Sequence, residues 1–448
     1  MTNDLTQGPI GSWLYRLTAP MVLGILAIFL FNLIDTYFIG LLGTEPLAAV
    51  SFTFPVTMVI MNIAIGLSIA TGALVSRAIG QKNPEKAAQW ILSSLYLAII
   101  LGLSLAFIAY VFLQPLFLLL GATEQLMPMI IAYMNWWLMG SVFLIIIIII
   151  NSSIRASGNT KFPSLLMLAS AVLNGILDPL LIFGLGPFPE LGIKGAAMAT
   201  FISWFAAFLL LVHYLFKNRL LPNLLASNLM ASWKKLLSLG IPAALTNMLG
   251  PVANGILVAW VASYGTSAVA AYGVGSRLEP LAVLMVLAFT ASLPPFVGQN
   301  HGAGKDKRIE QALIKSMKFI LVWQMLIYIV LALLADTISG LFSDDENVTR
   351  IIKMFIYILP ISYFGLGFSM VITSTLNALH KPRYSLYINA LRLFILYLPF
   401  SWIGNHYFGL NGLFAGCALA NITIGIVTIM LFNCSRHHDK WRHKLLKI

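Results

Sequence analysis

Long apolar stretches separated by short polar breaks make up most of this sequence. Apolar stretches of roughly 20 or more residues are long enough to cross the hydrocarbon core of a bilayer as a helix. Glycine, proline and charged residues gather in the breaks, as is typical of turns. We therefore predict twelve transmembrane helices, over residues 13–40, 47–78, 90–118, 125–156, 163–186, 194–216, 235–263, 268–300, 311–338, 347–379, 384–404 and 410–433.

The two halves of the chain resemble each other at a constant offset of 222 residues. Residues that recur at this offset include Pro20 and Pro242, Asn32 and Asn254, Gly43 and Gly265, and Gly80 and Gly302. Six crossings in each half leave both halves in the same orientation, so they are parallel repeats. The predicted fold is an all-α polytopic membrane protein, with two six-helix lobes around a central cleft. The N-lobe covers residues 1–216, a cytoplasmic linker 217–234, and the C-lobe 235–448.

Composition and charge agree with a membrane protein and set its orientation. The 448 residues are 59% hydrophobic and 9% charged, with a mean hydropathy of +0.90. The net charge of +12 does not indicate nucleic-acid binding, because 22 of the 27 Lys and Arg residues fall on one side of the predicted helices. That side faces the cytoplasm by the positive-inside rule, so both termini of this multi-pass inner-membrane protein are expected there. The first helix lacks the pattern of a cleavable signal peptide.

Three of the 15 acidic residues lie well inside predicted helices, namely Asp35, Asp178 and Glu279, whereas Asp336 lies near the outer end of its helix. A charge at the bilayer centre costs at least ~3 kcal/mol, so such residues usually have a function. Asp178 shares a helix face with Asn174 at i, i+4. Leu257 and Phe400 stand at the positions equivalent to Asp35 and Asp178. We interpret this asymmetry as a coupling site in the N-lobe, where Asp35 takes up a proton or holds Na⁺. The alternative is a structural hydrogen-bonded pair that locks two helices together.

Other intramembrane residues suggest further roles. Arg277 and Glu279 define a possible C-lobe polar site, with a structural or gating role and a substrate role equally open. Pro20 removes one backbone hydrogen bond and favours a kink about four turns before Asp35. The helix either bends there when Asp35 is neutralised or holds a static kink. The chain has 18 Met and many aromatic residues, which suit an adaptable apolar cavity, and Tyr37, Met61 and Trp136 are candidates to line it.

Several classes of chemistry find no support in the sequence. It lacks the GxxxxGK[ST] motif of a P-loop ATPase and the HExxH and CxxC motifs of common metal sites. The Gly-x-Gly-Asp motif of an intramembrane aspartyl protease is also missing. Cys417 and Cys434 do not form a disulfide framework. We therefore expect neither an enzyme nor a bound cofactor, and the only ion expected is a proton or Na⁺.

The chain resembles the multidrug and toxic compound extrusion (MATE) family of secondary transporters over essentially its whole length. The resemblance rests on the 6+6 repeat and on four segments: Pro20 followed by Asn32-Leu-Ile-Asp35, Ala156-Ser-Gly-Asn-Thr-Lys161, Leu173-Asn-Gly-Ile-Leu-Asp-Pro179 and Gly195-Ala-Ala-Met-Ala-Thr200. The acids in the N-lobe are similar to those of the prokaryotic branch named for a DNA-damage-inducible protein. The helix-10 segment Gly367-Phe-Ser-Met-Val-Ile372 has no aspartate, which argues against the C-lobe sodium site of the other bacterial branch.

This resemblance implies a function and a site. Asp35 would be the protonation site, hydrogen-bonded with Asn174, Asp178 and Thr200, and Asn151 would line the same N-lobe cavity. The protein would be a monomer in the bilayer that exports small cationic, amphipathic drugs in exchange for protons. Two alternatives stay open: sodium coupling at Asp35 and Asp178, and a flippase for lipid-linked saccharides, which related folds perform.

Overall fold

The computed structural model describes residues 3–218 and 228–437, with side chains described as far as Phe432. The described residues form helices joined by short turns and contain no β-strand. The predicted all-helical membrane fold is therefore confirmed. Half of the predicted linker (residues 219–227 of 217–234) and the last eleven residues of the chain lie outside the described part.

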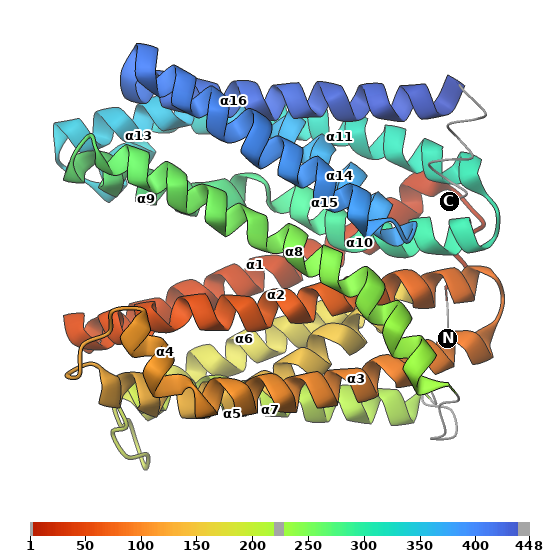
Figure 1. Ribbon diagram of the computed structural model, residues 1–448, viewed down its shortest axis with the longest axis horizontal. Helices are drawn as coiled ribbons and strands as arrows, with labels where there is room; N and C mark the ends of the chain where they lie inside the picture. Colours follow the sequence, from red (N-terminus) through yellow and green to blue (C-terminus); the bar gives the residue numbers. More distant parts are fainter. Residues whose placement is uncertain (1–2, 219–227, 438–448) are drawn as a thin grey trace.

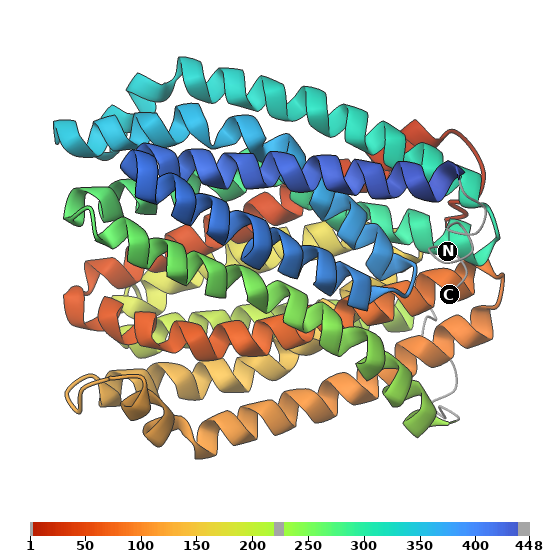
Figure 2. The same ribbon diagram turned by 45° about the horizontal axis from the view of Figure 1, so that its top comes forward.

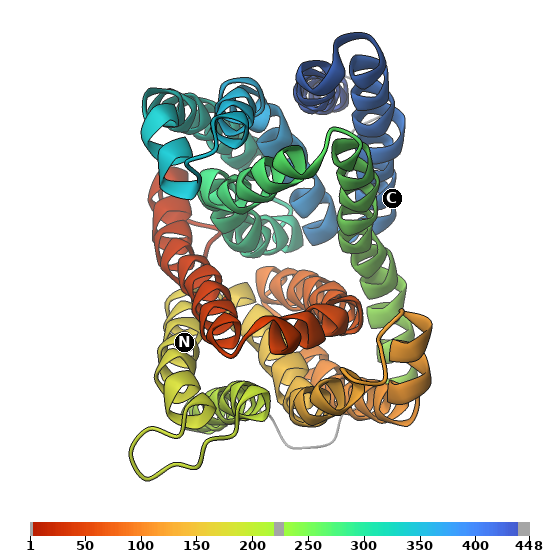
Figure 3. The ribbon, with the colours of Figure 1, turned by 90° about the vertical axis from the view of Figure 1, so that its left-hand side faces the viewer.

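The N-lobe forms the lower half of Figure 1 and of Figure 3. Six of its helices are long, and the third predicted span is broken at Phe112 into a long helix and a short one. Its helices are α1 (Ile10–Leu41), α2 (Thr44–Gly80), α3 (Pro84–Val111), α4 (Leu113–Leu119), α5 (Met127–Ala156), α6 (Lys161–Ile182) and α7 (Ile193–Lys217).

The C-lobe forms the upper half of both views and is more interrupted than the N-lobe. A proline at position 360 and a π-helical segment account for two of its breaks, since proline lacks the backbone donor that continues a helix. Its elements are α8 (Leu229–Ala262), α9 (Thr266–Ala282), α10 (Leu284–Gly302), α11 (Asp306–Leu333), α12 (Ala335–Phe342), α13 (Glu346–Ile358), the 3₁₀ turn η1 (Pro360–Ser362), α14 (Tyr363–Ala378), α15 (Pro382–Ala390), the π-helix η2 (Leu391–Tyr397) and α16 (Leu398–His437).

The number of membrane crossings follows from helix lengths. Ten helices of the described chain are long and apolar enough to span, and α9 with α10, bent by 44°, makes an eleventh. One of the ten runs from Pro382 to Phe432, and its 51 residues would be about 77 Å long if straight, more than twice the core thickness. The chain turns back at Gly409, whose φ is 61°, and Figure 2 shows the reversal. The structure thus agrees with twelve crossings.

The backbone repeats its unusual conformations at the 222-residue offset. Gly43 and Gly265, which precede α2 and α9, have φ of 117° and 96°. Lys82 and Gly304 are left-handed at 54° and 70°, and so are Gly158 and His380 at 83° and 64°. Lys82 and His380 adopt this conformation although they carry a side chain, which costs roughly 1–2 kcal/mol each. The same turns therefore recur at equivalent places in the two halves.

The first helix of each half begins in the other lobe. Leu5, Ile10, Leu14 and Leu17 at the start of the chain pack in the C-lobe core. Leu236 and Leu239 at the start of α8 pack in the N-lobe core. Figure 1 shows α8 crossing from the N-lobe at the right to the C-lobe. These exchanged segments join the lobes at the end that carries Arg77, Lys82 and Lys305, called the basic end below. Toward the other end, α1 and α2 diverge from α9 in Figure 1.

Candidate functional site

The N-lobe polar cluster is built on α6 and α7. Asn174 and Asp178 follow each other by one helical turn on α6, and Thr200 faces them from α7. The Asn174 Nδ2 donates to Asp178 Oδ1 at 3.2 Å and lies 3.4 Å from Thr200 Oγ1. Asn174 and Asp178 are fully buried and Thr200 is 4% exposed. The structure therefore brings these three predicted residues together in the core of the lobe.

Asp35 lies beside this cluster on α1 but is not hydrogen-bonded to it. Its Oδ1 is buried and has no hydrogen-bond partner among the described residues, and the same is true of Asp178 Oδ2. The expected hydrogen bond between Asp35 and the α6–α7 residues is thus absent. The two carboxylates are nevertheless close enough for the charge of Asp35 to act on Asp178. The described part of the chain supplies no ion-pair partner for either acid, so the pair has no counter-charge.

Tyr133 of α5 is a member of the cluster that the sequence reasoning missed. It is 6% exposed, and both Asp35 and Asp178 act electrostatically on its hydroxyl group. A signal was available, because Tyr133 lies three residues before the candidate Trp136 and so shares its helix face. The cluster thus combines two carboxylic acids (Asp35 and Asp178), one amide (Asn174) and two hydroxyl groups (Thr200 and Tyr133). Such a set can hold and exchange a proton.

The other predicted cavity residues are more scattered. Trp136 packs edge-on against Phe201 with 5.5 Å between ring centroids, Met61 is half-buried, and Tyr37 is 62% exposed. Asn151 is buried with an unpartnered Oδ1, but it lies five residues from the basic end of α5. Asp35 lies six residues from the opposite end of α1. The two residues thus lie toward opposite ends of their helices, and a shared cavity for Asn151 and Asp35 stays a prediction.

In the C-lobe, Glu279 and Arg277 point in different directions. Glu279 is half-buried and acts electrostatically on Arg392 of the π-helical segment. Tyr363, which begins α14 after the 3₁₀ break, has a buried hydroxyl group without a partner in the described chain. Arg277 is exposed. The described residues include no group of three or more His, Cys, Asp or Glu that could hold a metal ion.

At the basic end, α2 and α10 touch backbone to backbone. A side chain at Gly80 would collide with the carbonyl oxygen of Gln299, and one at Gly302 would collide with that of Arg77. These two contacts are equivalent, because Gly80 corresponds to Gly302 and Arg77 to Gln299 at the 222-residue offset. The lobes therefore meet in a pseudo-two-fold interface, which we call the basic-end gate.

The segment before α1 (residues 3–8) ties this gate together. Asn3 Nδ2 donates to the carbonyl oxygen of Gly158 in the N-lobe at 2.9 Å. On the C-lobe side, the Leu5 amide donates to Gln299 Oε1 at 3.0 Å, and Lys305 donates to the Thr6 carbonyl at 2.8 Å. Leu5 is fully buried. The segment also lines a cavity of about 790 Å³ at this end of the molecule. The gate is closed in this structure.

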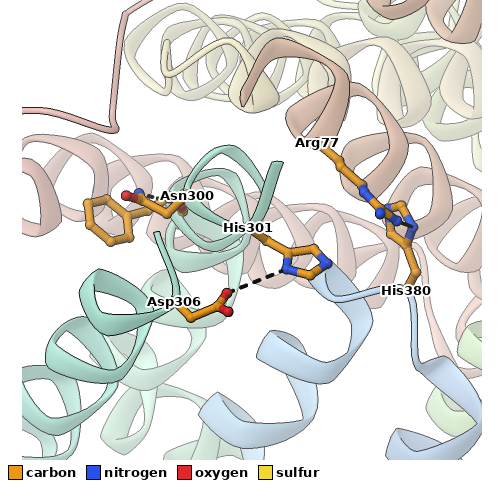
Figure 4. A network of polar contacts seen from close by, with 6 residues as sticks. Arg77, Asn300, His301, Asp306 and His380 are labelled. Atoms are coloured by element: carbon orange, nitrogen blue, oxygen red, sulfur yellow. Dashed lines mark hydrogen bonds and ion pairs between the residues drawn. The ribbon is translucent and has the colours of Figure 1, made fainter. Parts of the chain in front are cut away.

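His380 of the C-lobe joins the gate through its neutral ring (Figure 4). Its Nε2 lies 3.1 Å from the Ala73 carbonyl and must donate to it, so its Nδ1 accepts from Arg77 Nη1, also at 3.1 Å. A second contact nearby joins His301 Nδ1 and Asp306 Oδ1 at 3.8 Å. Protonation of His380 would place two donors face to face, so the gate requires the neutral ring.

The gate should open as the pH falls on its side of the membrane. Burial, aided by the charges of Arg77, His301 and Lys235 and opposed by the bond to Ala73, lowers the pKa of His380 to about 4. When the gate opens, the pKa of His380 returns toward its ordinary value of about 6.5. The neutral ring therefore favours the closed gate fully above pH 6.5, and this contribution is lost progressively as the pH falls from 6.5 to 4. The closed-to-open ratio should fall roughly 30-fold from pH 8 to pH 5.

Distances between spin labels at Lys86→Cys and Lys307→Cys measure this change. The matched variant His380→Gln keeps an acceptor for Arg77 and a donor for Ala73 but cannot titrate. It should therefore lose most of the pH response. An equal response in His380→Gln and wild type would show that another group controls the gate.

A helical membrane protein with a sealed interface at one end and unpaired carboxylates in one lobe has features typical of secondary transporters. The MatE family model matches residues 20–180 and 242–403, at almost the same offset as the internal repeat. The chain belongs to the MATE family.

Relatives and solved structures agree with this assignment. The chain is 42% identical over 432 residues to a protein of Shewanella oneidensis named FAD transporter, covering 96% of each chain. It is 28% identical to the multidrug export protein MepA of Staphylococcus aureus, covering 95% of this chain and 94% of MepA. The Vibrio cholerae MATE transporter VcmN in the bent form has 36% identity and a TM-score of 0.92, with 98% and 99% coverage. The chain is thus a multi-pass membrane transporter.

Proposed function

We propose that this protein exports an organic substrate by exchanging it for protons that bind at Asp35 and Asp178. The observation that carries the proposal is the pair of carboxylates with buried, unpartnered oxygens and no ion-pair partner in the described chain. A buried unpaired charge costs several kcal/mol, and two neighbouring carboxylates repel each other, so protonation stabilises the site. Asn174, Thr200 and Tyr133 hold the site in place. Sodium at the same oxygens is the alternative.

The direction of transport follows from the charge distribution. The positive-inside rule puts the basic end in the cytoplasm. The structure then corresponds to a state that is closed toward the cytoplasm, with Asp35 near the outer side, where protons enter. Protonation there would release the substrate outward. Pro20 gives α1 a point at which it can bend during this step, in line with the interpretation of the sequence.

For the substrate we propose a flavin dinucleotide such as FAD. The support is the 42% identity to the FAD transporter over nearly the whole of both chains, compared with 28% for MepA. Cationic amphipathic drugs are the second candidate, because two acidic side chains in the N-lobe favour a cation. A lipid-linked saccharide is less favoured, since neither relative is named for one.

Transport into inside-out membrane vesicles tests both parts of the proposal. Such vesicles expose the cytoplasmic face, and FAD and ethidium are suitable probes of the two substrate classes. With an acid interior and sodium-free buffer, vesicles with the protein should accumulate FAD well above vesicles without it. Accumulation of ethidium alone would select the drug exporter. Accumulation that requires a sodium gradient would refute proton coupling.

A further inference from the structure

Arg277 is an unpaired guanidinium group deep within the membrane. It lies eleven residues after the start of α9 at Thr266, about 16 Å along the helix, which is close to half of the hydrocarbon thickness. Its side chain is exposed and makes no hydrogen bond or ion pair with any residue that the structure describes. Because a charge facing lipid at this depth is costly, Arg277 must face water or a ligand.

The packing of α9 sets the direction in which Arg277 points. Gly275 lies against the ring of Phe355, so this face of α9 packs on α13 inside the C-lobe. Arg277 follows two residues later, and residues at i and i+2 lie on opposite sides of a helix. Figures 1 and 3 both show α9 between α13 and the N-lobe helices. Arg277 therefore points from the C-lobe toward the N-lobe.

Glu279 does not neutralise Arg277. It is again two residues away along α9, and its electrostatic partner is Arg392 inside the C-lobe. The possible C-lobe polar site predicted from the sequence is therefore two separate features. Glu279 and Arg392 interact electrostatically within the lobe, whereas Arg277 has no acidic partner among the described residues and faces the space between the lobes.

We infer that Arg277 binds a phosphate group of the substrate and so selects anionic aromatic substrates over cationic ones. This inference rests on the proposed export of a dinucleotide. A guanidinium group presents parallel N–H donors that match the oxygens of a phosphate, and it also stacks on aromatic rings. A cationic dye would gain nothing from this contact and would be repelled by it. Secondary transporters of this type bind substrate near the bilayer midplane, which is the depth of Arg277.

The test compares Arg277→Gln with wild type in inside-out vesicles, using FAD, carboxyfluorescein as a second anionic aromatic probe, and ethidium. Arg277→Gln should raise the KM for FAD roughly 10-fold or more, the usual loss for a charge-assisted hydrogen bond. Ethidium transport should be unchanged or faster. Arg277→Lys, which keeps the charge, should recover part of the loss. Arg350→Gln, a change at an exposed arginine of α13, is the matched control and should behave as wild type.

Each outcome decides between the readings. If Arg277→Gln loses FAD transport and ethidium transport equally, Arg277 has a structural role. If the KM for FAD is unchanged in this variant, Arg277 does not contact the phosphate. Both overturn the inference. If wild type carries carboxyfluorescein but not FAD, the dinucleotide proposal fails, and the effect of Arg277→Gln on carboxyfluorescein decides the role of Arg277. If wild type carries neither anion, Arg277 is not an anion site, while proton-driven ethidium transport would leave the coupling proposal standing.

Discussion

Asp35→Asn should abolish concentrative transport while leaving the fold intact. Asparagine has nearly the same shape as aspartate but cannot gain or lose a proton, so the N-lobe loses one of its two titrating groups. One charge moving through 100 mV contributes ~2.3 kcal/mol, which corresponds to a roughly 50-fold accumulation of substrate. In inside-out vesicles, accumulation should therefore fall to the level of passive equilibration. Asp178→Asn should act in the same direction.

A control variant and a binding measurement distinguish loss of proton coupling from a general loss of function. Glu190→Gln, which removes an acid from the loop between α6 and α7, should transport as wild type. Binding of ethidium or FAD to detergent-solubilised Asp35→Asn should persist, because the variant loses coupling rather than the substrate site. Full accumulation by Asp35→Asn would show that Asp35 is not a coupling residue and would favour the structural reading of the acidic pair.

Gly80→Ala should hold the basic-end gate open. In the closed state a Cβ atom at this position would collide with the Gln299 carbonyl oxygen, which belongs to the backbone and cannot rotate away. Overpacking of this kind costs about 1–3 kcal/mol, enough to shift the gate equilibrium about 5- to 150-fold. Export should fall by a similar factor, because the cycle passes through the closed state. Gly302→Ala, the equivalent substitution in the other repeat, should give the same result.

Spin-label distances between Lys86→Cys and Lys307→Cys report the gate directly, with Cys434 replaced by serine and the buried Cys417 retained. Gly80→Ala and Gly302→Ala should move the population toward longer distances. Gly273→Ala, at a site with nothing within 4 Å of the added Cβ, should leave the distances unchanged. An unaltered distribution in Gly80→Ala would mean that the α2–α10 contact does not control closure.

The architecture could be predicted because the apolar segments and the internal repeat are visible in the sequence itself. Apolar length marks each crossing, and the 222-residue offset pairs Gly43 with Gly265 and Gly80 with Gly302. The breaks within spans were not predicted. The bend at Val283 and the π-helix at Leu391–Tyr397 depend on tertiary packing, which apolar length does not report. The exchange of the first helical turns between lobes is likewise a property of packing.

The candidate site was predictable only in part. Asn174 and Asp178 share a face by helix geometry alone, and Thr200 joins them in the structure as the resemblance implied. The position of Asn151 near the basic end of α5 was also predictable from the sequence, because it lies close to the turn at residues 157–161. The basic-end gate could not be predicted from the sequence. Residues such as Asn3 and Gln299 have no distinctive sequence pattern, and their contacts form only when folding brings distant segments together.

The most direct test of proton coupling at Asp35 and Asp178 is the movement of protons driven by substrate. Inside-out vesicles that contain the protein, an internal pH dye and a preset acid interior would receive FAD or ethidium outside in sodium-free buffer. Proton exchange predicts that addition of the transported substrate alkalinises the interior in proportion to the substrate taken up, and that Asp35→Asn removes this signal. Substrate uptake with no change in internal pH, or uptake that appears only when sodium is supplied, would contradict it.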